Sequence, residues 1–113
     1  MSTLSGSVQP ILTARCAVPG CHTGSAPPQD LDLSEGQTFT NTVNVPANET
    51  AQTTMLMRIR PEQPDSSYLV HKIQGTHVAA GGSGGRMPLS GCCLSTTQIN
   101  TIRAWVTAGA LNN

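Results

Sequence analysis

The chain has 113 residues, a length typical of a single domain, and its six basic and six acidic residues give a net charge of zero. This charge balance argues against a nucleic-acid or anionic-lipid partner, and no apolar run approaches the length of a membrane span. With a single Phe, a single Tyr and a single Trp, the chain lacks the residues that usually supply buried area, so its core needs a staple, a partner or a cofactor.

The first predicted helix begins near Ser7 and ends at about Cys16. Ser7 can cap this helix, and Pro10 falls in its first turn, where a missing N–H group is harmless. The apolar face consists of Val8, Ile11 and Leu12.

The middle of the chain is predicted to be loops and short extended segments. Residues 23–35 read as a loop from which Leu31 and Leu33 can point inward. Residues 39–45 are rich in Thr and Val and predict an extended segment, as do residues 56–59.

A helix is predicted over about residues 66–74. Asp65 is its expected cap and Gly75 its expected stop. Its buried side consists of Leu69, Val70 and Ile73. The six glycines of residues 75–91 then exclude regular structure there.

The last helix has the clearest local signals in the chain. Ser95 and Gln98 have the spacing of a capping box, and Leu94 precedes them as one half of a hydrophobic staple. Gly109 is the expected end. One apolar stripe is formed by Ile99, Ile102, Trp105 and Val106.

The main chemical motif is Cys16-Ala17-Val18-Pro19-Gly20-Cys21-His22. Covalent haem attachment needs this order, because two thiols add to the vinyl groups of the porphyrin and an adjacent imidazole reaches the iron. The usual signature is C-x-x-C-H. Here two more residues separate the cysteines, and Pro19-Gly20 can form a turn that takes up the extra length. A haem would also supply the apolar centre that the composition lacks.

A second axial ligand can come from Met87, which stands in a glycine-rich loop just before a proline. A methionine ligand raises the reduction potential relative to imidazole. Arg86 beside it can pair with a haem propionate or remain solvated. The rival ligands are Met55, Met57, His71 and His77, of which His77 is the strongest because it lies in the loop that leads to Met87.

Together these features resemble a class I c-type cytochrome domain of the monohaem, bacterial type. The resemblance runs from about Ser7 to Ala110 and implies a mainly α fold in which the first and last helices cross around one covalent haem c. It also implies thioether bonds at Cys16 and Cys21, with His22 and Met87 as the iron ligands. The matching segments are residues 8–12, Cys16, Cys21, His22, residues 65–70, 86–88 and 99–110.

Two features depart from the family pattern. The spacing of the haem cysteines is longer than usual, which leaves open how standard attachment machinery handles it. The adjacent pair Cys92-Cys93 falls where ordinary loop residues are expected. The pair can form a disulfide between neighbours, remain as free thiols, or bridge to another chain.

The functional expectation is a single domain over residues 1–113 that transfers electrons to redox partner proteins and is not an enzyme. Since covalent haem is normally attached outside the cytoplasm, we expect a periplasmic or extracellular protein. No signal peptide is visible, so the chain is expected to be a mature or excised domain behind an added Met1, and it can be part of a larger redox protein.

Three other interpretations remain open from the residues alone. One is a haem enzyme or a gas or peroxide sensor with an open or His-ligated sixth position. Another is a disulfide-stapled extracellular interaction domain without haem. The third is a zinc site, which requires four ligands, and the adjacent Cys92 and Cys93 are poorly placed to complete it.

Overall fold

Four α-helices are present in residues 2–89 and 91–113, which are the residues that this computed structural model describes. The radius of gyration, 12.5 Å, is close to the ~13 Å of a compact folded domain of this length. None of the helices in these two ranges has the length and apolar run needed to cross a membrane. The helices are α1 (Gln9–Arg15), α2 (Thr38–Thr42), α3 (Tyr68–Gln74) and α4 (Thr96–Thr107). The prediction of a mainly α fold is confirmed at this level.

The N-terminal helix begins earlier than predicted. A π-helical turn over Leu4–Val8 leads directly into α1, and Thr3 is the N-cap because its side-chain oxygen accepts a hydrogen bond from the Gly6 N–H at 3.0 Å. The hydroxyl of Ser7 accepts a bond from the Thr3 N–H at 3.3 Å. The prediction of Ser7 as the cap was therefore wrong, since Ser7 lies inside the first turn.

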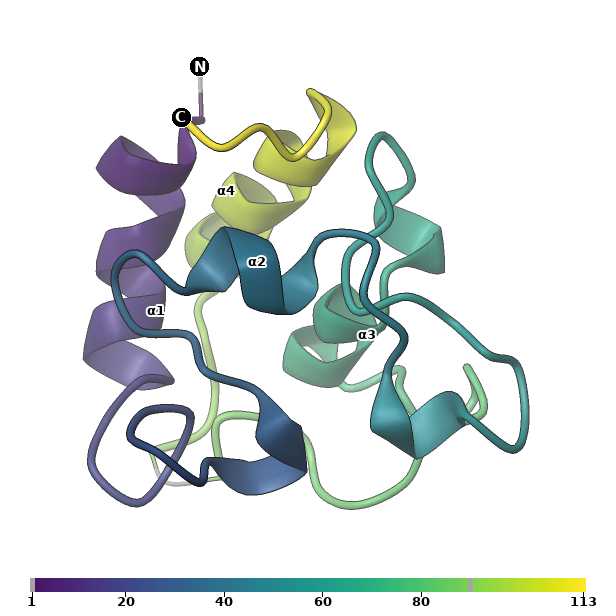
Figure 1. Cartoon of the computed structure of the whole chain (residues 1–113). Coiled ribbons are helices and arrows are strands. Elements are labelled where there is room, and N and C mark those ends of the chain that lie inside the picture. The colour runs from purple at the N-terminus through teal and green to yellow at the C-terminus, as the bar shows by residue number, and fades with distance from the viewer. Residues whose placement is uncertain (1, 90) are drawn as a thin grey trace.

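The two ends of the chain lie together, and α4 packs against the helical turn Leu4–Val8 (Figure 1). Trp105 is 1% exposed, and its indole N–H donates a hydrogen bond to the Leu111 carbonyl at 2.9 Å. The predicted apolar faces of both helices meet in this core, where Val8, Leu12, Ile102 and Val106 are buried.

The prediction of an extended segment at residues 39–45 was wrong, because α2 occupies Thr38–Thr42. The Thr42 hydroxyl donates to the Thr38 carbonyl at 2.8 Å, and the Thr38 hydroxyl donates to Gln9 Oε1 at 2.7 Å. All three of these side chains are buried. Contacts with the N-terminal helix thus override the strand preference of β-branched residues.

The second extended segment, residues 56–59, is present without a continuous sheet. Isolated bridges join Ile59 to Val43 and Met57 to both Pro46 and Ser67. These pairings hold the segment between α2 and α3.

The ends of α3 agree only in part with the sequence prediction. Gly75 ends the helix with a left-handed φ of 83°, as expected, but the helix begins at Tyr68 with no side-chain cap. The carboxylate of Asp65, the expected cap, instead accepts a hydrogen bond from Arg103 of α4 at 2.8 Å.

The capping box of α4 is confirmed. The Ser95 N–H donates to Gln98 Oε1 at 2.9 Å, and the Gln98 N–H donates to Ser95 Oγ at 3.1 Å. Leu94 is buried just before the cap, and Ile99 packs against the core.

Candidate functional site

An apolar hollow lies between the end of α1, the following loop, α3 and Met87. It consists of two adjoining compartments: one of about 120 Å³ on the side of α3, here called the inner compartment, and one of about 130 Å³ on the side of the cysteine loop, here called the outer compartment. Both compartments are lined by Cys16, His22, Pro28 and Met87. The apolar walls of the inner compartment include Leu31, Leu33, Leu69 and Ile73, so the two leucines predicted to point inward from the loop do so.

The cysteine motif folds as a turn that keeps its two ends close. The Cys21 N–H donates to the Val18 carbonyl at 2.9 Å, and Gly20 has the positive φ of 84° that the second position of such a turn requires. The His22 N–H then donates to the Cys16 carbonyl at 3.0 Å. Pro19-Gly20 therefore absorbs the two extra residues as the sequence predicts.

The two cysteines of this motif carry free thiols in different surroundings. Cys16 follows directly after α1 and is buried, and this burial raises the pKa of its thiol to about 11. Cys21 is half-buried and lines only the outer compartment.

His22 is oriented by the loop that faces it. Its Nδ1 lies 3.0 Å from the Leu31 carbonyl oxygen, and because a carbonyl only accepts, Nδ1 carries the proton. Burial, with a contribution from Arg58 and Lys72, lowers the pKa of the imidazole below its usual value despite the hydrogen bond to Leu31. His22 is therefore neutral at neutral pH, with the Nε2 lone pair available to a metal.

Met87 is the methionine that the fold brings to His22. It lines both compartments, and its backbone N–H donates to the Lys72 carbonyl at 3.1 Å, which attaches the loop to α3. Of its two rivals, Met55 is 72% exposed and Met57 lies outside the walls of both compartments.

The two rival histidines are held elsewhere. His77 is buried in the glycine-rich loop, where its Nε2 is 2.8 Å from the Gly84 carbonyl oxygen. His71 is half-buried rather than solvated, with Nε2 2.7 Å from the Asp65 carbonyl oxygen and Nδ1 2.6 Å from the Thr76 hydroxyl. Neither imidazole lines the hollow.

One wall of the inner compartment is polar, and sequence reasoning missed it. Lys72 is buried on α3, with Nζ 2.6 Å from both Glu49 Oε1 and the Ser83 carbonyl oxygen. The Tyr68 hydroxyl donates to the same Glu49 oxygen at 2.5 Å. Burial alone would raise the pKa of Glu49, but the hydrogen bonds from Lys72 and Tyr68 lower it below its usual value.

A second buried cation, Arg58, lies on the same wall. Its guanidinium donates to the Asn41 carbonyl at 2.8 Å and to the Gln29 carbonyl at 2.5 Å, and it has no carboxylate partner within the described ranges. Arg86, the arginine singled out from the sequence, donates instead to the Ile73 carbonyl at 3.0 Å and lies outside both compartments. No local pattern marks Arg58 or Lys72 as buried, because their partners come from distant segments.

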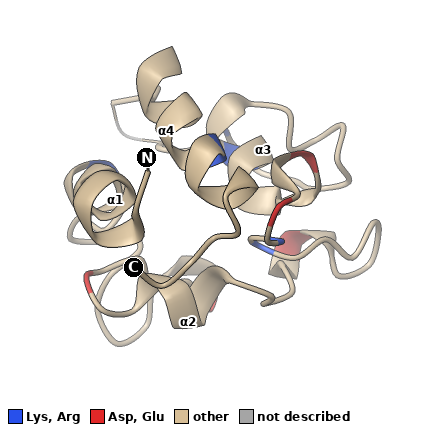
Figure 2. Cartoon of the chain, turned by 90° about the horizontal axis from the view of Figure 1, so that it is seen from above, with Lys and Arg blue, Asp and Glu red and all other residues tan. Residues whose placement is uncertain are grey.

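Few other charges are present. Figure 2 shows Lys, Arg, Asp and Glu as short separate stretches on a ribbon that is otherwise uncharged. The exposed Arg103–Asp65 pair joins α4 to the turn before α3. Charged residues of one sign therefore do not gather in one stretch of the ribbon.

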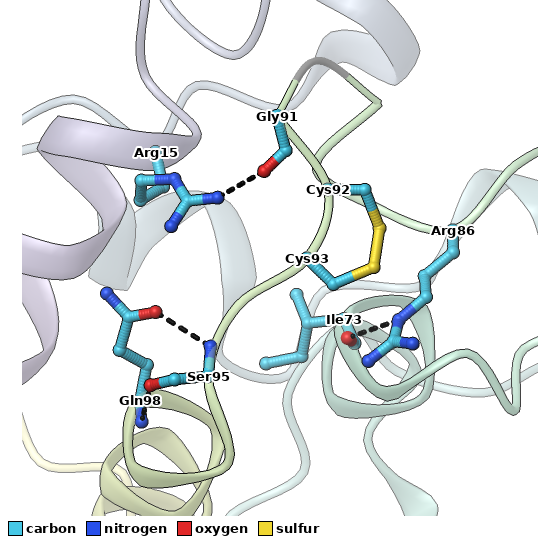
Figure 3. Close-up of a disulfide and its surroundings, with 8 residues drawn as sticks. All are labelled: Arg15, Ile73, Arg86, Gly91, Cys92, Cys93, Ser95 and Gln98. Atoms are coloured by element: carbon cyan, nitrogen blue, oxygen red, sulfur yellow. Dashed lines mark hydrogen bonds between the residues drawn. A yellow bond between two sulfur atoms is a disulfide. The ribbon is translucent and has the colours of Figure 1, made fainter.

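Cys92 and Cys93 are joined as a disulfide between neighbours (Figure 3). This is one of the three arrangements that the sequence left open. The pair precedes the capping box of α4 and lies outside the walls of the hollow.

Within residues 2–89 and 91–113, no three His, Cys, Asp or Glu side chains gather as ligands for one metal ion. The ligand set of a zinc site is thus not assembled by these residues. The chain matches no protein-family model, no curated protein and no solved structure with which it was compared.

Proposed function

We propose that this chain is a monohaem c-type cytochrome domain that carries one electron between redox partners, with His22 and Met87 as iron ligands. One observation carries the proposal. Cys16, His22 and Met87, which span more than seventy positions of the sequence, line the same two adjoining compartments. A methionine that served only for packing would have no reason to line the same hollow as the histidine of the cysteine–histidine motif.

The donor set fits a covalent haem. Cys16 and Cys21 are unpaired thiols suited to thioether bonds, and His22 presents a neutral Nε2 with its other nitrogen already hydrogen-bonded. Met87 adds the thioether of a second axial ligand. The two compartments together still fall short of the ~300 Å³ of an ordinary small-molecule site, so a macrocycle would need both and would have to displace parts of their walls.

The polar wall fits the acidic side of the same group. A haem carries two carboxylates, and the inner compartment offers two buried cations, Arg58 and Lys72, against one half-buried carboxylate, Glu49. A positive excess in an apolar cavity favours a bound anion. Arg58 and Lys72 are therefore the residues we assign to the propionates, in place of Arg86.

When bound, haem supplies an iron that exchanges one electron between the ferric and ferrous states. The protein's part is to hold both axial side chains, keep water from the apolar walls and set the charge beside the carboxylates. The Leu31 carbonyl fixes His22, and the Lys72 carbonyl fixes the backbone of Met87. Because both anchors belong to the folded chain, little needs to rearrange when an electron is transferred.

We place partner docking at the rim of the outer compartment. Leu89 lines this compartment and is 68% exposed, and Pro88 and Val18 lie on the same wall. An apolar rim with few charges gives weak, transient association that changes little with salt. A steep loss of partner binding on addition of salt would contradict this assignment. Periplasmic or extracellular residence follows from where covalent haem is attached.

The test is the visible spectrum of protein produced with a haem-attachment system. We expect red protein with sharp bands on reduction, and a weak far-red iron–thioether band in the oxidised form that Met87→Ala removes. Met55→Ala is the matched control and should keep this band, because Met55 is outside the hollow.

Other outcomes would point to the competing functions. A far-red band that survives Met87→Ala but disappears in Met57→Ala would identify Met57, rather than Met87, as the axial ligand. Rapid binding of carbon monoxide by the reduced wild-type protein would favour a sensor or enzyme with an open sixth position. Colourless protein from cells that mature other c-type cytochromes would overturn the proposal and leave the disulfide-stapled domain.

A further inference from the structure

The Cys92–Cys93 disulfide does not staple distant parts of the chain. The cross-link closes a ring between adjacent residues, whereas the stabilisation from a disulfide grows with the length of chain that it closes. The pair therefore restricts the unfolded chain very little. A chemical role explains its presence better than a contribution to stability.

The pair is open to solvent. Cys92 and Cys93 are both exposed, in contrast to the buried Cys16. Figure 3 shows the two sulfur atoms on the side of the chain that faces Arg86. A reducing thiol can therefore reach the disulfide without unfolding of the protein.

Two guanidinium groups flank the pair. Arg15 donates a hydrogen bond to the Gly91 carbonyl at 2.5 Å, and Arg86 donates to the Ile73 carbonyl beneath the disulfide (Figure 3). Within the part of the chain that is described, neither arginine forms an ion pair with a carboxylate. Their uncompensated charge favours the approach of a thiolate and stabilises the thiolate that leaves.

We propose that Cys92–Cys93 is a thiol–disulfide exchange site that accepts two electrons from a dithiol reductant. One thiolate of the reductant attacks a sulfur of the pair, the S–S bond breaks, and the other cysteine leaves as a thiolate that takes up a proton. The second thiol of the reductant then attacks the mixed disulfide. The reductant ends as a disulfide, and the chain gains two electrons and two protons as two thiols.

A consequence for the haem ligand follows and rests on the proposed function. Met87 and the cysteine pair belong to one loop, anchored at Arg86 on one side and at Gly91 on the other. Opening the ring releases the backbone at residues 92 and 93 next to the Gly91 anchor. We expect an open ring to weaken the far-red iron–thioether band of the ferric protein, and this is read in a variant without the ring because a dithiol also reduces the iron.

The test exposes native protein to dithiothreitol, blocks thiols with N-ethylmaleimide and digests with trypsin. Cleavage after Arg86 and Arg103 puts the pair in peptide 87–103, apart from Cys16 and Cys21 in peptide 16–58. We expect both thiols of peptide 87–103 to be labelled about as fast as in unfolded protein. Labelling only after unfolding, or full labelling without any reductant, would overturn the proposal.

Two further arms sharpen the result. Reduced thioredoxin replaces dithiothreitol at equal concentration, and faster labelling with it would identify a protein dithiol as the reductant, whereas slower labelling would identify a small dithiol. Cys93→Ser, which cannot close the ring, should show the weakened far-red band without reductant. Labelling is measured by mass and does not depend on haem. Colourless protein would therefore contradict the proposed function without affecting the test of the exchange site.

Discussion

The contact between α4 and the N-terminal helical turn and the walls of the hollow are held together in different ways. Where α4 meets the N-terminal helix, the contacts are apolar and the side chains are almost fully buried, with Trp105 at their centre. The hollow is instead bounded by α3 and by irregular chain, and side chains attach these segments to carbonyl groups of other segments: His22 to Leu31, Arg58 to Gln29 and Lys72 to Ser83.

This difference means that the contacts that stabilise the fold are largely not the contacts that position the site residues. Apolar burial where α4 meets the N-terminal helical turn stabilises the fold in proportion to the area removed from water. The polar bonds of the walls contribute less each but determine where His22 and Met87 lie. Substitutions in the two regions should therefore have different signatures, and the following experiments test that separation in order of expected effect.

Trp105→Ala should have the largest effect. Removal of this side chain leaves a cavity between α4 and the N-terminal helical turn, and we expect a loss of about 3–5 kcal/mol in the free energy of unfolding, measured by chemical denaturation. Leu111→Ala is the control, since Leu111 is 56% exposed and its carbonyl, rather than its side chain, receives the indole N–H. Equal losses for the two variants would contradict the assignment of Trp105 to the core.

Lys72→Met should destabilise by about 3 kcal/mol, because it leaves the largely buried Glu49 carboxylate without its cation. Adding Glu49→Gln should recover much of that loss. The exposed pair offers a matched control, and Asp65→Asn should cost less than about 1 kcal/mol. If both ion pairs have the same cost, the polar wall is less buried than the structure indicates.

Before haem attachment, Cys16 should react with iodoacetamide at least about tenfold more slowly than Cys21 at neutral pH. The raised pKa of about 11 keeps the Cys16 thiol protonated, and only the thiolate is nucleophilic. The rate at Cys16 should keep rising with pH until about 11. Mass spectrometry of the alkylated protein measures both rates, and equal rates at neutral pH would exclude a buried Cys16.

Ser95→Ala should cost about 1 kcal/mol through loss of the cap of α4. Thr3→Ala, which removes the cap of the helical turn Leu4–Val8, should lower the free energy of unfolding by a similar or smaller amount. Ser7→Ala gives a useful contrast, since Ser7 Oγ only accepts a bond from the Thr3 N–H. A greater loss for Ser7→Ala than for Thr3→Ala would restore Ser7 as the main cap.

Local patterns in the sequence were sufficient for several elements. The capping box at Ser95 and Gln98 and the stop at Gly75 depend on contacts within a few residues, so the sequence predicts them directly. The turn at Pro19-Gly20 belongs to the same class. The spacing of Cys16, Cys21 and His22 likewise identified one half of the candidate site before any fold was known.

Only the tertiary structure decided the remainder. It made α2 from residues that favour strands, because buried hydroxyl groups of Thr38 and Thr42 found partners there. It placed Met87 in the hollow and Met55 in solvent. It also buried Arg58 and Lys72, whose partners are far away in sequence. Burial and long-range hydrogen bonds depend on which segments meet, and no short window of sequence contains that information.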